Sequence, residues 1–129
     1  MPYIYAQADR LPGQPKAGTG ECVALVRQFA KAPHSSIWRE GERVFGNKRI
    51  KLGTAIATFE NGRWPGRAAG NHAALYIGQD STAVSVVDQW NKGDTLKKIR
   101  LRRILKKPLK ADGSFFDPSS NALAFSVIE

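Results

Sequence analysis

The chain contains a single cysteine, Cys22, and only two histidines, His34 and His72, among its 129 residues. One cysteine excludes an internal disulfide framework and a zinc site built from several thiolates. No apolar run approaches the roughly 20 residues of a transmembrane helix, so we expect no membrane insertion. The first ten residues, MPYIYAQADR, lack the basic and apolar segments of a secretory leader. We therefore expect synthesis in the cytoplasm, with any export by a route that needs no cleavable leader.

Acidic residues are absent from one stretch of the chain, residues 97–110, which carries most of the net charge of +9. The rest of the sequence has 12 basic and 11 acidic residues and is close to neutral. A protein that coats nucleic acid over its whole surface is therefore disfavoured, whereas one anionic partner surface is not. The basic residues of this stretch are Lys97, Lys98, Arg100, Arg102, Arg103, Lys106, Lys107 and Lys110.

The hydrophobic pattern predicts one early helix followed by several strands. Apolar residues in ECVALVRQFAK (21–31) recur at helical spacing, with Thr19 as the expected N-cap. Residues 50–59, 72–77, 83–89, 96–105 and 122–128 read as strands, and residues 33–49 as a loop. This order predicts an α+β fold, with one domain over residues 1–129 and the helix on an antiparallel sheet.

Cys22 is the first candidate for chemistry because it lies in the first turn of the predicted helix. Free backbone N–H groups and the helix dipole favour an anion at that position. A nearby imidazolium would convert the thiol into a strong nucleophile. The alternative is that Cys22 is a small core residue of an amphipathic helix.

His72 and Asp88 are the second and third candidates. The segment GQDST (78–82) predicts a turn, so residues 72–77 and 83–89 form a hairpin. If Ile77 pairs with Ala83, then His72 lies directly opposite Asp88 on the same face of the sheet. The carboxylate would then orient the imidazole toward a thiol, as in a Cys-His-Asp triad. A chance cross-strand ion pair is the alternative.

Three segments that carry these residues resemble the NlpC/P60 and CHAP peptidases, papain-like enzymes that cleave peptide bonds in bacterial cell walls. Residues 20–26 (GECVALV) resemble their cysteine-bearing helix, residues 70–78 (GNHAALYIG) their histidine strand, and residues 86–90 (VVDQW) the strand with the third polar residue. The resemblance covers roughly residues 14–91. It implies a single hydrolase domain with Cys22 as nucleophile, His72 as general base and acid, and Asp88 as the orienting residue.

The resemblance also implies further site residues. The backbone N–H of Cys22 would stabilise the oxyanion, and Gln14 is the candidate for a second donor, although its spacing to Cys22 differs from that in papain-like enzymes. Trp64 and Trp90 are candidates for substrate contacts because they flank the candidate triad. No metal or other cofactor is needed for such a reaction.

Small members of this clan without a leader include type VI secretion amidase effectors, which bacteria inject into rivals. The expected function is therefore a cysteine amidase or endopeptidase acting on peptidoglycan stem peptides. The expected setting is delivery to the periplasm of a target bacterium, with an immunity protein as inhibitor.

Three other functions stay open at this point. The basic stretch 97–110 suits a module that binds nucleic acid, although no groove-reading helix or aromatic RNA-binding motif is present. It also suits a non-catalytic wall-binding relative, in which Cys22 is buried and inert. The same triad also supports other acyl transfers, such as deamidation or transglutamination.

Overall fold

The computed structural model describes residues 1–129 and contains one α-helix and a six-stranded antiparallel sheet. The strands lie in the order β1-β6-β2-β3-β4-β5, and every neighbouring pair is antiparallel. The expected α+β class is confirmed. The elements are η1 (Ala8–Arg10), α1 (Cys22–Phe29), η2 (Ser35–Ile37), β1 (Glu40–Arg43), β2 (Ala55–Thr58), β3 (Ala73–Gln79), β4 (Ala83–Asp88), β5 (Arg100–Leu105), η3 (Pro118–Ser120), η4 (Ala122–Ala124) and β6 (Phe125–Ile128).

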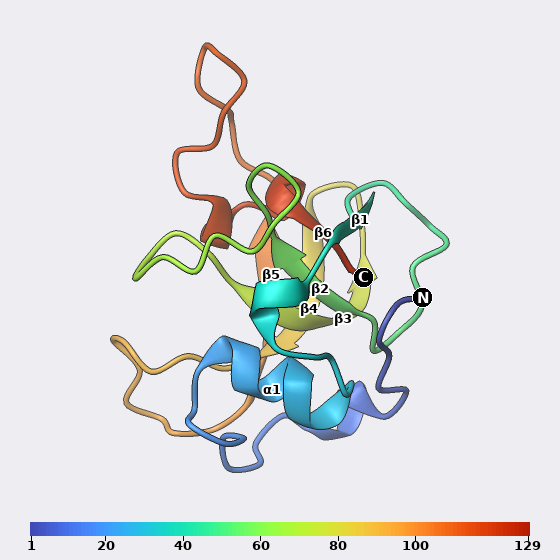
Figure 1. Cartoon of the computed structure of the whole chain (residues 1–129), viewed down its shortest axis with the longest axis vertical. Helices are drawn as coiled ribbons and strands as arrows, with labels where there is room; N and C mark the ends of the chain where they lie inside the picture. Colours follow the sequence, from blue (N-terminus) through green and yellow to red (C-terminus); the bar gives the residue numbers. More distant parts are fainter.

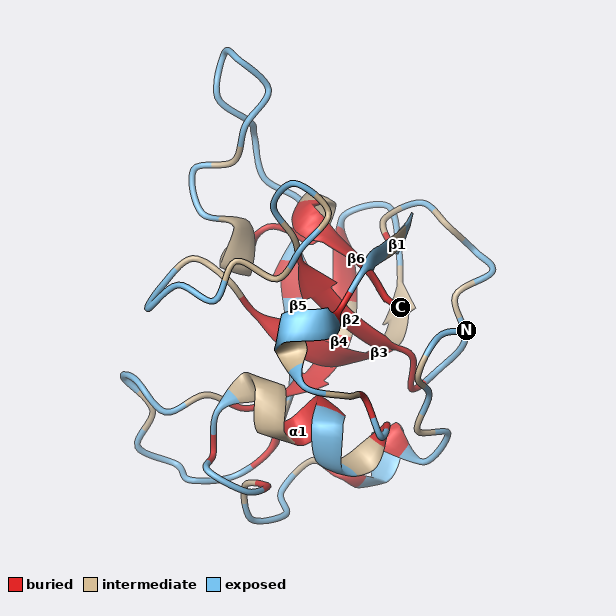
Figure 2. Ribbon diagram, in the orientation of Figure 1, coloured by how far each residue is buried: buried red, intermediate tan, exposed pale blue.

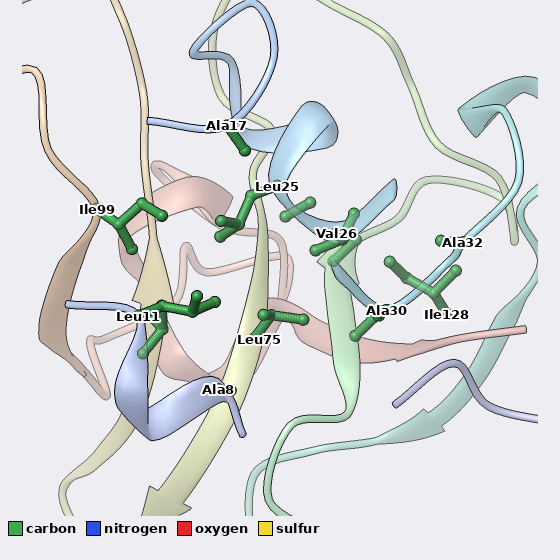
Figure 3. Packing of buried hydrophobic residues seen from close by; sticks show 14 of the residues in the cluster. Ala8, Leu11, Ala17, Leu25, Val26, Ala30, Ala32, Leu75, Ile99 and Ile128 are labelled. Atoms are coloured by element: carbon green, nitrogen blue, oxygen red, sulfur yellow. The ribbon is translucent and has the colours of Figure 1, made fainter. Parts of the chain in front are cut away.

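Helix α1 lies against the sheet at the lower end of the view in Figure 1. Its apolar face, with Leu25 and Val26, packs on Leu75 of β3, as expected from the helical spacing of the apolar residues (Figure 3). The expected N-cap was wrong. Glu21 is the N-cap, whereas the Thr19 hydroxyl accepts a 3.4 Å hydrogen bond from the Glu21 amide. None of the helices is long and apolar enough to cross a membrane.

The sheet separates two clusters of buried side chains, and its central strands are the most deeply buried part of the molecule (Figure 2). One cluster joins α1 and the N-terminal segment to Leu75, Val87 and Ile99. The other lies around Val86 and Phe125. Both clusters reach β3 and β4, so these two strands hold the rigid centre from which the site residues project.

Strand β1 is an element that the sequence did not predict. Its residues, Glu40–Arg43, are mostly charged and exposed and show no apolar alternation. They form a strand because they pair with β6, whose own residues are buried. Trp38, two residues before β1, is fully buried, and its indole N–H donates to the Pro33 carbonyl.

The β3–β4 hairpin forms as predicted, but its register differs from the prediction. Leu75 pairs with Val87 and Tyr76 with Val86, whereas Gly78 pairs with Ser85. One extra residue, Ile77, therefore forms a β-bulge between the two halves of the hairpin. His72 is consequently not directly opposite Asp88.

Strand β5 forms the edge of the sheet, and exposure of its side chains does not follow their polarity. Leu101 is 59% exposed, whereas Ile104 is buried and the Arg100 and Arg102 side chains are partly buried. Asp80, Asp88 and Asp94 bind the three arginines of the basic stretch. The strand is therefore held to β4 and its loops by ion pairs as well as by its backbone.

Candidate active site

An open groove of about 910 Å³ runs along the N-terminal end of α1 and contains both Cys22 and His72. Loops before β3 and after β4 form its other walls. The residues that line it are Thr19, Glu21, Cys22, Val23, Ala24, Arg27, His34, Ser35, Trp64, Gly66, Arg67, Ala68, Asn71, His72, Trp90, Asn91 and Lys92. The structure therefore brings together residues that are 50 positions apart in the chain.

Cys22 lies in the first turn of α1, as the sequence predicted, where it is the first helical residue, and it is half-buried. Its backbone N–H belongs to the first helical turn, where amides have no acceptor within the helix. The N-terminal end of the helix dipole favours a thiolate there. Cys22 is not the fully buried core residue that the alternative interpretation required, because it lines the groove.

Two residues that follow Asp88 fix the loop in front of Cys22. Gln89 is fully buried; its Oε1 accepts from the Ala17 amide, and its Nε2 donates to the carbonyls of Ala17 and Glu21. Asn91 donates to the Thr19 carbonyl. Because Gln89 belongs to the chain that leaves β4, the start of α1 is held at a defined place relative to Asp88.

Two features of the backbone at Gly20, two residues before Cys22, exclude a residue with a side chain. Its φ of +87° is unfavourable for residues with a side chain. A Cβ at this position would also lie 2.4 Å from the Oδ1 atom of Asn91. Glycine is therefore required for the close approach of this loop to Asn91.

His72 immediately precedes β3 and is anchored on β2. Its amide donates to the Thr58 hydroxyl, and its carbonyl accepts from the Thr58 amide. The ring nitrogen Nε2 lies 2.7 Å from the Oδ2 atom of Asp88. Since Nε2 is occupied, Nδ1 is the nitrogen available to the Cys22 thiol. The three candidates Cys22, His72 and Asp88 are thus brought together.

The surroundings of His72 favour its charged form. Burial by itself lowers the pKa of the imidazole, but hydrogen bonds to Asp88 and Cys22, with their negative charges, outweigh it and raise the pKa to about 9. His72 is therefore an imidazolium at neutral pH. A thiol beside a charged imidazole is the arrangement that nucleophilic catalysis by cysteine requires.

Asp88 is a fully buried carboxylate with two cationic partners. Arg102 of β5 binds it through Nε and Nη2, and Nη2 lies 2.6 Å from the same Oδ2 atom that contacts His72. Burial raises the pKa of the Asp88 carboxyl, but the hydrogen bonds from His72 and Arg102 outweigh this effect and hold it below its ordinary value. Asp88 is therefore ionised at neutral pH.

Both tryptophans proposed from the sequence line the groove. The Trp90 ring lies edge-on to His72, with a centroid distance of 6.5 Å, and the guanidinium groups of Arg100 and Arg102 lie 4.7 Å from its centroid. Trp64 packs edge-on against buried Trp38. Each indole is half-buried, contacts other side chains of the protein and also lines the groove.

Gln14 is not part of this site, contrary to the expectation that it supplies an oxyanion donor. Its side chain is exposed, does not line the groove and donates instead to the Arg10 carbonyl. The backbone of Gln14 explains its position, because its carbonyl accepts from the Ile99 amide and joins the N-terminal segment to the chain before β5.

The groove carries more positive than negative charge. Arg27, Arg67 and Lys92 line it, and Glu21 is the one acidic residue among the lining residues. Arg67 is paired with Glu60 outside the lining, whereas Arg27 and Lys92 have no acidic partner. Such a groove favours a ligand that carries carboxylates.

Sequence reasoning missed Gln89 and Arg102. Gln89 is a polar residue directly after the apolar run of β4, and its importance depends on a loop 70 residues earlier in the chain. Arg102 was predicted only as one of the basic residues of the stretch 97–110, with no part in the site. A weak indication was available, because Asp88 is the only acid within the predicted strand 83–89 and the next predicted strand is rich in arginine.

Comparisons with known proteins agree with this geometry. The family model described as Domesticated amidase effector 2 matches residues 6–116. The Type VI secretion amidase effector 2 protein of Salmonella typhi is 41% identical over 134 aligned positions that cover both chains completely. A solved structure of Type 6 secretion amidase effector 2 (Tae2) superposes with a TM-score of 0.89 and 41% identity, covering 98% of this chain and 94% of that one. The resemblance predicted from residues 20–26, 70–78 and 86–90 is confirmed. The chain belongs to the domesticated amidase effector 2 family.

Proposed function

We propose that this chain is a cysteine amidase that hydrolyses amide bonds in the stem peptides of bacterial peptidoglycan, through one hydrolase domain that spans residues 1–129. The observation that carries the proposal is the contact chain Cys22–His72–Asp88 at the floor of an open groove. The amidase relatives, 41% identical over the whole chain, support the reaction class.

The proposed reaction starts with the thiolate of Cys22 and the imidazolium of His72. The thiolate attacks the amide carbonyl carbon, and the backbone N–H of Cys22 donates to the oxyanion that forms. The C–N bond then breaks as His72 transfers its Nδ1 proton to the leaving amine, which leaves a thioester on Cys22. His72 next removes a proton from water, which attacks the thioester. A carboxylic acid product leaves, and the thiolate and imidazolium are restored.

Asp88 orients this cycle. Its bond to Nε2 of His72 leaves Nδ1 directed at the thiol and stabilises the imidazolium. Trp64 and Trp90 are proposed to contact the substrate beside the scissile bond, and Arg27 and Lys92 to attract the carboxylates of the stem peptide.

The proposed setting follows the relatives, whose names describe type VI secretion effectors. We infer that this chain is delivered to the periplasm of a competing bacterium, where peptidoglycan is accessible. A producing cell would then need an immunity protein, which would act by covering the groove.

Digestion of purified peptidoglycan tests this function. The wild-type protein should release soluble fragments, and Cys22→Ala should lower the rate by at least about a thousandfold while its circular dichroism spectrum stays unchanged. In water enriched in oxygen-18, each new carboxyl group should carry one heavy oxygen, and product masses would identify the cleaved bond. Undiminished release of fragments by Cys22→Ala would rule out this assignment.

The same digest separates amide hydrolysis from other acyl transfers. Deamidation would release ammonia and add about one mass unit without cutting the peptide, and transglutamination would join two peptides. Neither gives shorter fragments. If no shorter fragments form and ammonia or joined peptides appear, the amidase assignment is wrong and the corresponding acyl transfer takes its place.

A further inference from the structure

Arg102 makes contacts that its position in a basic, partly exposed strand does not suggest. Its Nε lies 2.9 Å from Oδ2 and 3.1 Å from Oδ1 of Asp88, and its Nη2 lies 2.6 Å from Oδ2. Its guanidinium also lies over the Trp90 ring. Two planar contacts fix this side chain in one orientation, which a flexible surface cation would not have.

The register of the sheet explains how Arg102 reaches the carboxylate. Arg102 pairs with Val86, and Asp88 pairs with Arg100, so Arg102 and Asp88 are diagonal neighbours on one face of β4 and β5. His72 approaches the same carboxylate from β3. Asp88 is therefore held between two strands, with a cationic side chain on each side.

The reaction makes this second cation useful. When His72 gives its proton to the leaving amine, it becomes neutral, and Asp88 loses one of its two positive partners. A fully buried carboxylate without a positive partner is costly and tends to take up a proton. A protonated Asp88 could no longer hold the Nε2 hydrogen of His72 in the same way, and the imidazole would lose its orientation.

We propose that Arg102 is a positioning residue that keeps Asp88 ionised and correctly oriented in both protonation states of His72. This inference rests on the proposed function for its place in the reaction. Arg102 does not itself line the groove; it lies behind Trp90 and acts on His72 through Asp88. Its Nη2 lies 3.5 Å from Nε2 of His72, which is too long and wrongly polarised for a hydrogen bond, since both atoms are donors when Nε2 binds Asp88.

The charged groups around Asp88 determine the expected effect on pH dependence. His72 faces it from the start of β3, and Arg102 faces it from β5; Cys22 faces His72 from α1. Arg100, which pairs with Asp88 in the sheet, directs its guanidinium to Asp94, and Lys16 also binds Asp94. Removal of the Arg102 charge therefore takes one cation away from Asp88, His72 and Cys22. Each of these groups should then lose its proton only at a higher pH.

The test compares Arg102→Gln, which removes the charge, with Arg102→Lys, which keeps it but loses the planar fork. Two profiles are measured for each protein: hydrolysis of peptidoglycan fragments against pH, and the rate at which iodoacetamide alkylates Cys22 against pH. In Arg102→Gln, both limbs of the hydrolysis profile and the midpoint of the alkylation profile should move upward by about one pH unit. Its kcat at the optimum should fall about tenfold or more. Arg102→Lys should lose kcat but keep the wild-type limbs.

Arg103→Gln is the matched control, because Arg103 is the next residue of β5 and pairs with exposed Asp80. It should behave as the wild type. Unmoved limbs in Arg102→Gln, or an equal shift in Arg102→Lys, would overturn the proposal, as would an equal shift in Arg103→Gln. If Arg102→Gln does not fold, Arg102→Lys decides alone: a lower kcat with unmoved limbs would support the proposal, and a wild-type kcat or moved limbs would overturn it.

The alkylation profile separates this inference from the proposed function. If the wild-type protein does not cut peptidoglycan, the proposed substrate is wrong, but alkylation of Cys22 still reports the thiol–imidazole pair. An upward shift of the alkylation midpoint in Arg102→Gln alone would then support the positioning role of Arg102. An unchanged midpoint would overturn that role whatever the substrate.

Discussion

His72 and Asp88 share a hydrogen bond of 2.7 Å although their backbones are diagonal neighbours of the β3–β4 hairpin and do not face each other. Near the turn, Gly78 pairs with Ser85, and in that register residues 72 and 88 would lie on opposite faces of the sheet. The bulge at Ile77 advances the register by one residue. It returns His72 to the face of Asp88, so a local irregularity of the strand assembles the site.

The first prediction concerns this bulge. Insertion of one alanine between Ala74 and Leu75 leaves the pairs Leu75–Val87 and Tyr76–Val86 in place and should turn His72 to the face opposite Asp88, with a loss of hydrolysis of at least about a hundredfold. Deletion of Ile77 removes only the extra residue and keeps both pairs, so it should leave His72 on the face of Asp88. The measurement is the initial rate on purified peptidoglycan. Insertion of one glycine between Ser81 and Thr82 is the control, because it lengthens the exposed turn without changing strand pairing. Wild-type rates after the alanine insertion would contradict the role of the register.

The second prediction concerns Asp88. Asp88→Asn should lower kcat by about a hundredfold to ten-thousandfold, since the amide cannot stabilise the imidazolium as a carboxylate does. The loss should be smaller than that of Cys22→Ala, because the nucleophile is still present. Asp112→Asn changes an exposed carboxylate and should leave the rate unchanged. Equal rates for Asp88→Asn and the wild type would exclude an orienting role.

The third prediction concerns Gln89. Gln89→Leu removes two buried hydrogen bonds to Ala17 and one part-buried hydrogen bond to Glu21, and should lower the free energy of unfolding by about 2–4 kcal/mol. Urea denaturation measures this change. The rate should also fall, because the loop that precedes Cys22 loses its attachment to β4. Gln28→Ala, on the exposed side of α1, should change stability by less than about 0.5 kcal/mol.

The fourth prediction concerns pH and stability. The pKa of His72 is about 9 in the folded protein against 6.5 in its reference state, so the folded state binds more protons between these values. The stabilising contribution of His72 is complete below pH 6.5 and is lost as the pH rises through 9. The free energy of unfolding should therefore fall by up to about 3 kcal/mol between pH 6.5 and 9. His72→Gln should show a flatter profile; parallel profiles for the two proteins would refute this linkage.

The fifth prediction concerns the positive charge of the groove. The double variant Arg27→Gln with Lys92→Gln should raise KM for stem peptides several-fold at low salt and leave kcat nearly unchanged, because these side chains attract substrate without touching the reacting atoms. Lys48→Gln with Lys51→Gln removes the same charge from outside the groove lining and serves as control. An identical KM for both double variants would argue against carboxylate recognition in the groove.

Local patterns predicted the helix at Cys22 and the β3–β4 hairpin because each depends on neighbouring residues. The apolar spacing of 22–29 fixed the helix, and the turn GQDST fixed the hairpin partners. The bulge was not predicted because Gly78, which directly follows Ile77 and lies within β3, was assigned to the turn 78–82 and not to the strand. The predicted pairing differs from the observed one by three residues near the turn and by two residues beyond the bulge, and only this even offset kept His72 and Asp88 on one face.

Contacts between distant segments account for the other differences. β1 is a strand only because β6 pairs with it, and nothing in EGER predicts that partner. The environments of Gln89 and Arg102 depend on the loop before α1 and on the order of β4 and β5 in the sheet. Gln14 failed as an oxyanion donor because its loop is directed by a backbone bond to Ile99.

The solitary thiol also determines how this protein responds to oxidants. Peroxide would convert the Cys22 thiolate to a sulfenic acid, and the chain has no second cysteine to capture it as a disulfide. Recovery would then depend on a small-molecule thiol from outside, and without one the sulfur would proceed to irreversible sulfinic acid. The protein would therefore lose its reactive thiol over time in an oxidising compartment, at a rate set by the oxidants and thiols around it.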